Sequence, residues 1–117
     1  MNLYLASYEF QDFEIPRTIK DFKRLQLDGR NVLAVEVDQP LIGQKYGLLG
    51  VDVTTFYLVN RVDESAFEHF HTFPIDVHVL LMKSSTKTMP HSLDELQNIA
   101  WACLYENEQD AKEHRIR

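Results

Sequence analysis

The sequence predicts an α+β fold: a two-layer sandwich in which an antiparallel or mixed sheet of about four strands carries a C-terminal helix across one face. Three observations indicate it. Runs rich in β-branched residues at 31–38, 51–62 and 75–82 are typical of strands. The capping-box pattern Ser92–Glu95 precedes apolar residues at helical spacing. The chain has 117 residues, which suits one hydrophobic core.

The N-terminal part offers one strand and one ambiguous segment. Residues 3–10 alternate aliphatic and aromatic side chains at period two, which predicts a strand. In residues 18–27, Thr18 and Asp21 have the spacing of a helix start, and we favour a helix ending at Asp28-Gly29. The alternative makes this segment a strand and Asp28-Gly29 a type I′ hairpin turn, because both residues tolerate positive φ.

The central and C-terminal parts supply the rest of the sheet and its helix. Residues 31–38 form a strand that Gln39-Pro40 ends, and 41–50 form a glycine-punctuated loop. Apolar residues on both sides of 51–62 indicate a central strand, which we expect to pair antiparallel with 75–82. The closing helix would bury Leu96, Ile99, Ala100 and Cys103. The chain is therefore expected to be a single domain, 1–117, with 107–117 as a fraying polar tail.

Charge and cysteine usage narrow the functional classes. The formal net charge is -6. This excess of acidic over basic residues argues against nucleic-acid binding, because the affinity for nucleic acid comes mainly from clustered Lys and Arg. A single cysteine excludes an internal disulfide and indicates a reducing, cytoplasmic compartment. No apolar run approaches the ~20 residues of a membrane span, so no membrane association is expected.

A histidine cluster provides the enzymatic alternative. His69 and His71 would lie on one face of a strand about 7 Å apart, and His78 follows nearby. Three imidazoles with an open water position suit zinc, which predicts a small metal-dependent hydrolase or lyase. Histidines more often occupy the solvated face of a strand, so we rank this hypothesis second and expect no cofactor.

The preferred hypothesis is a small acidic protein-interaction module: an adaptor, a regulator or an immunity-type inhibitor without catalysis. The loop residues Gln44, Lys45 and Tyr46 offer a contact surface, because loops carry function more often than scaffold strands do. Tyr105 would anchor the complex, and the acidic Glu106 and Glu108 would attract a basic protein partner. This hypothesis is compatible with either a monomer or a homo-oligomer.

Overall fold

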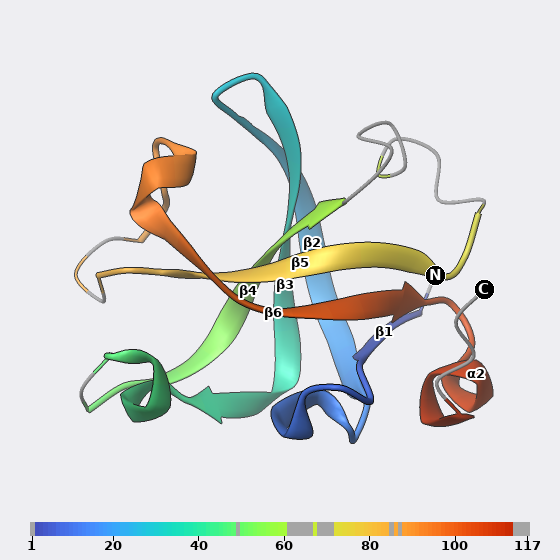
Figure 1. The fold of residues 1–117 in the computed structure, drawn as a ribbon. Coiled ribbons are helices and arrows are strands. Elements are labelled where there is room, and N and C mark those ends of the chain that lie inside the picture. Colours follow the sequence, from blue (N-terminus) through green and yellow to red (C-terminus); the bar gives the residue numbers. More distant parts are fainter. Residues whose placement is uncertain are drawn as a thin grey trace.

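The computed structural model describes residues 2–48, 50–60, 67, 72–84, 86 and 88–113. This part of the chain forms six antiparallel strands in one closed barrel, in which each strand pairs with the next and the last pairs with the first (Figure 1). The strands are β1 (Leu3–Ala6), β2 (Arg17–Leu27), β3 (Arg30–Ile42), β4 (Asp52–Asn60), β5 (Ile75–Met82) and β6 (Leu96–Tyr105). Three 3₁₀ turns, η1 (Gln11–Phe13), η2 (Gly43–Tyr46) and η3 (Leu93–Glu95), and the short helix α2 (Glu108–Glu113) complete it.

The expected two-layer sandwich with a long C-terminal helix is therefore wrong. Residues 96–105 form strand β6, whose pairing with β5 runs from Leu96 to Leu104. The register slips where Val79 faces Ala100 but Leu80 faces Asn98, which leaves Ile99 as an extra residue. A bulge of this kind shifts the alternation by one position, so the apolar spacing imitates a helix. The last four residues of β6 are also buried, whichever face of the sheet they point to. This part of the strand therefore lacks the alternation of apolar and polar residues that marks a strand with one solvated face.

The capping box itself is present but closes only a short turn. The Glu95 carboxylate accepts hydrogen bonds from the backbone N–H groups of His91, at 2.7 Å, and Ser92, at 3.1 Å. These bonds stabilise η3, after which the backbone becomes extended at Leu96. Packing of residues 96–105 between two strands therefore outweighs the local helix signal.

The favoured helix at residues 18–27 is also wrong, and the hairpin alternative is correct. Asp28 has φ 53° and Gly29 has φ 80°, as a type I′ turn requires, and they join β2 to β3. The expected strand 75–82 matches β5, and 51–62 contains β4; the two pair antiparallel as predicted.

The barrel interior holds the main core. Aliphatic and aromatic side chains from all six strands meet there, joined by Phe13 from η1 and by Phe67. A second apolar cluster lies on the outside of β2, β3 and β4, and a third forms where α2 covers β1 and β6. The most deeply buried large residues are Phe13, Phe56, Phe67, Leu3, Leu5, Leu33, Leu41, Leu58, Leu81, Leu104 and Tyr105.

Arg17 is buried among these apolar residues, with 7% of its surface exposed. Its guanidinium lies 4.8 Å from the centre of the Phe13 ring and 5.9 Å from that of Phe56. It donates hydrogen bonds to the carbonyl of Gln39, at 3.0 Å, and to that of Asp12. Burial lowers the pKa of Arg17, but an arginine stays charged at neutral pH. These contacts satisfy a buried cation and join η1, β2 and β3.

We predict that Gly29→Ala destabilises the protein by about 1–2 kcal/mol, because an L-residue is disfavoured at positive φ. A Cβ at this position meets no atom within 4 Å, so conformation alone accounts for the cost. Urea unfolding measures the change, with the exposed strand position Lys23→Ala as the control. A stabilising effect of Gly29→Ala would indicate a helix at this position and contradict the hairpin.

Candidate functional site

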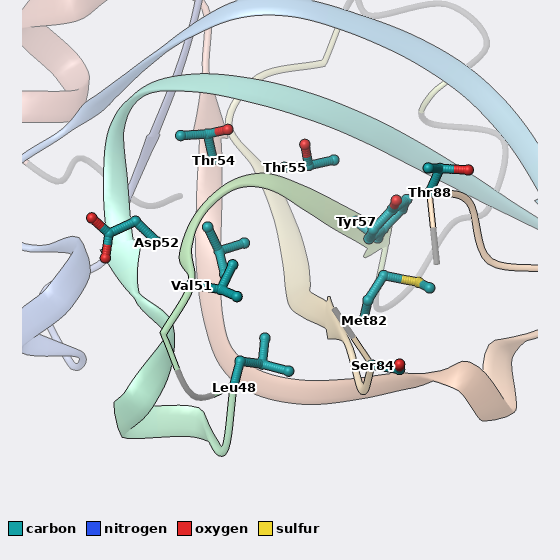
Figure 2. A pocket seen from close by; sticks show the side chains of 10 residues that line it. Leu48, Val51, Asp52, Thr54, Thr55, Tyr57, Met82, Ser84 and Thr88 are labelled. Atoms are coloured by element: carbon teal, nitrogen blue, oxygen red, sulfur yellow. The ribbon is translucent and has the colours of Figure 1, made fainter. Parts of the chain in front are cut away.

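A pocket of about 210 Å³ opens on the outside of the barrel, beside the first half of β4. Figure 2 shows Tyr57, Met82, Ser84 and Thr88 grouped at one end and Leu48, Val51 and Asp52 at the other. We call this surface the β4 groove. Its lining residues are Leu48, Val51, Asp52, Val53, Thr54, Thr55, Tyr57, Met82, Ser84 and Thr88.

The β4 groove exists because β4 and β5 diverge. Their paired residues run from Asn60, opposite Val77, to Tyr57, opposite Leu80. The preceding segment of β4, Asp52–Phe56, pairs with β3 but has no partner on β5 among the described residues. Figure 1 shows β4 bending away from β5 toward the turn that carries η2. A stretch of strand edge is thus left beside the pocket.

A bulge in β3 accompanies this divergence. Glu36 faces Thr55, but the next pair joins Leu41 to Val53, so residues 37–40 of β3 stand against Thr54 alone. The bulge is held from inside the barrel by the hydrogen bond between Arg17 and the Gln39 carbonyl. Its extra length changes the direction of both strands.

The far wall of the β4 groove depends on a glycine in η2. The Gly43 N–H donates to the Val51 carbonyl at 3.0 Å, and the Leu48 N–H donates to the Gly43 carbonyl at 2.9 Å. A Cβ on Gly43 would lie 2.3 Å from the Val51 oxygen, which is too close for any other residue. The glycine-punctuated loop is thus a tight turn that places Leu48 and Val51 in the groove.

Glu36 does not line the groove but binds two of the threonines that do. One carboxylate oxygen accepts from the Thr54 hydroxyl at 2.5 Å, and the other accepts from the Thr55 hydroxyl at 2.7 Å. These bonds hold the pKa of Glu36 below its ordinary value. Burial raises the pKa of Tyr57, which lies at the opposite end, so its phenol is neutral at physiological pH.

The chemistry available in the β4 groove is that of binding. Its polar groups are three threonine hydroxyls, Ser84, Tyr57 and the exposed carboxylate of Asp52, and no described residue of the lining is a histidine, cysteine or lysine. A serine or threonine hydroxyl requires an adjacent base to become a nucleophile. The groove therefore offers apolar contact, hydroxyl hydrogen bonds and one negative charge.

The expected contact loop is tied to the body of the protein. Gln44 and Lys45 are exposed, and Lys45 forms an ion pair with Asp12 at 3.1 Å. The Tyr46 hydroxyl donates to Asp12 at 2.5 Å, and burial together with this bond raises the pKa of Tyr46 to about 12. Two of the three side chains thus link η2 to η1.

The structure puts the other expected binding residues at α2. Tyr105 is 2% exposed, in the cluster that Ala111 covers, so its ring is not on the surface. Burial raises its pKa, and the neighbouring Cys103 thiol raises it further. Glu106 and Glu108 are exposed, and Glu108 pairs with Lys112 at 3.4 Å. Glu108 lies on the short helix α2 and not on the long C-terminal helix expected from the sequence, because residues 96–105 are a strand.

Two of the three histidines of the zinc hypothesis, His69 and His71, lie outside the described residues. His78 lies on the outer face of β5, where its Nδ1 is 3.0 Å from the side-chain nitrogen of Asn98. Across the described ranges, no group of three or more His, Cys, Asp or Glu side chains is placed to hold a metal ion. The zinc hypothesis stays a prediction from the sequence.

No family model, curated protein or solved structure matches the chain. Within the described part, no helix has the length and apolar character needed to cross a membrane.

Sequence reasoning missed the β4 groove. The sequence contains one partial sign of it: Thr54-Thr55 places two adjacent hydroxyls within the apolar run of 51–62. Their common acceptor, Glu36, is 18 positions from Thr54 and belongs to another strand. Nothing in a single sequence indicates where two neighbouring strands separate.

We predict that Thr54→Val raises the pKa of Glu36 toward its ordinary value of 4.5, because it removes the first of the bonds that stabilise the carboxylate. NMR titration of the Glu36 carboxyl carbon measures the shift, and Thr86→Val is the control on an exposed loop. The depressed pKa also means that this carboxylate stabilises the fold above pH 4.5, and that the contribution is lost as pH falls through the folded pKa. An unchanged pKa in Thr54→Val would show that the hydrogen bond does not form.

Proposed function

We propose that this protein is a non-catalytic protein-interaction module and that the β4 groove is its binding surface. The single observation that carries the proposal is a pocket lined by both apolar and hydroxyl side chains, beside a stretch of strand edge that has no strand partner among the described residues. Protein partners use both: pockets accept anchoring side chains, and strand edges accept backbone.

The size of the β4 groove favours a protein side chain over a small molecule. Ligand pockets for small molecules enclose roughly 300–1,000 Å³, whereas this one holds about 210 Å³ and opens to solvent. Ile42 extends the apolar surface beyond the pocket: it is 57% exposed and faces Asp52 across β3 and β4. Directly opposed residues point to the same side of a sheet, so a partner seated in the pocket also reaches Ile42.

Charge favours a basic partner. The chain carries a net charge of -6, and Asp52 adds an exposed carboxylate at the mouth of the groove. Long-range attraction of this kind raises the rate of encounter, while contact inside the pocket sets the lifetime of the complex. The acidic interaction module expected from composition is thus retained, with its surface moved from Tyr46 and Tyr105 to the β4 groove.

We predict that Thr88→Trp abolishes binding of peptides selected from a random display library on the immobilised protein, because the indole fills the pocket that Thr88 lines. Thr86→Trp is the matched control, since Thr86 is exposed on the same loop but does not line the pocket. Calorimetry of the selected peptides measures affinity for each variant. A library that yields no binder, or binders that Thr88→Trp leaves unaffected, would contradict the proposed function.

A further inference from the structure

We infer that the partner binds as an extended, basic peptide segment that adds a strand to the free edge of β4 between Asp52 and Phe56. This inference rests on the proposed function and specifies how the β4 groove is used. Its starting point is that a closed barrel normally leaves no strand edge exposed, yet the β5-facing edge of β4 has no strand partner among the described residues over Asp52–Phe56.

Backbone geometry supplies the hydrogen-bonding groups. In an antiparallel sheet, alternate residues direct both N–H and C=O toward the same neighbour. In Tyr57–Asn60 these backbone groups are directed alternately toward β3 and toward β5. In Asp52–Phe56 the groups directed toward β5 meet no strand among the described residues, and the pocket lies on that side. An incoming chain would find a row of donors and acceptors already held in extended geometry by β3.

Dimensions limit the segment. Five residues of β4 span about 17 Å at roughly 3.4 Å per residue, so the added strand has about five residues. Its side chains would alternate between the core-facing and solvent-facing sides of the sheet. The outward ones would lie over the pocket between Tyr57 and Met82, which favours a medium apolar side chain at that position.

Charge identifies the segment as basic. Asp52 is exposed, and no ion pair between described residues uses it. Glu36 adds a second carboxylate, which is bonded to the Thr54 and Thr55 hydroxyls of the groove and has a lowered pKa. A Lys or Arg at the Asp52 end of the added strand would lie well within the screening length of about 8 Å at physiological ionic strength. A second copy of the chain would instead bring its own net charge of -6 against these groups.

The test uses five- to seven-residue peptides selected from the random library on the intact protein. The selected sequences are expected to contain a Lys or Arg next to alternating apolar residues. Methylation of every second backbone nitrogen of a peptide should weaken its binding at least tenfold, and methylation of the intervening nitrogens should have a smaller effect. Peptide binding should slow amide exchange within residues 52–56, while exchange in 57–60 stays slow with or without peptide.

Charge variants complete the test. Asp52→Asn should weaken the selected peptides severalfold and reduce the dependence of binding on salt. Asp94→Asn, an exposed carboxylate on η3 outside the groove, is the control and should have no effect.

The outcomes separate the inference from the proposed function. Peptides that bind, lose affinity in Thr88→Trp, yet tolerate methylation at every nitrogen would overturn strand addition and leave the interaction function standing. Selected peptides rich in acidic residues would overturn the basic character of the partner. A dimer in analytical ultracentrifugation that protects residues 52–56 without peptide would show that a second copy occupies the edge, which also overturns the inference.

Discussion

The burial of the Arg17 guanidinium is the constraint on which the rest of the barrel depends. A buried cation is tolerated only where hydrogen bonds and aromatic faces replace its water, and η1, Phe56 and the β3 bulge supply them. Since one of the acceptors is the carbonyl of Gln39, the same contact that closes this end of the core also holds residues 37–40 out of the β3–β4 register. The divergence of β4 from β5 begins beside that bulge, so the β4 groove lies next to the place where a charge is buried.

Much of the local structure follows from local chemistry. The strands β4 and β5 were predictable because apolar and β-branched residues together dominate them. The Asp28-Gly29 turn was identified as an alternative because few other residue pairs accept its dihedral angles. Residues 18–27 and 96–105 were misassigned for one common reason: a bulge interrupts each strand, near Lys20 and at Ile99, and breaks the period-two pattern. Once these two segments are strands, the sheet has enough members to close, and the expected sandwich becomes a barrel.

The candidate site was less accessible to sequence reasoning than the fold. Tyr46 was chosen because it lies in a loop, and Tyr105 because tyrosine often anchors interfaces. Both are instead held inward by contacts that depend on tertiary structure: a carboxylate bonds the Tyr46 hydroxyl, and a helix covers the Tyr105 ring. The β4 groove has the opposite character. It results from the divergence of two strands, and only the register of β4 against both neighbours reveals that Asp52–Phe56 has no second strand partner in the part of the chain that the structure describes.

Strand β1 has a consequence for the order in which the fold assembles. It is four residues long and supplies the whole seam of the barrel, with Tyr4 opposite both Thr18 on β2 and Tyr105 on β6. The other pairings link strands that follow one another in the chain, so they form from local hairpins, whereas this one closes a loop of about a hundred residues at a large entropic cost. During synthesis, β1 can pair with β2 early, but its pairing with β6 has to wait until β6 has been made. Closure of the barrel is therefore a late event.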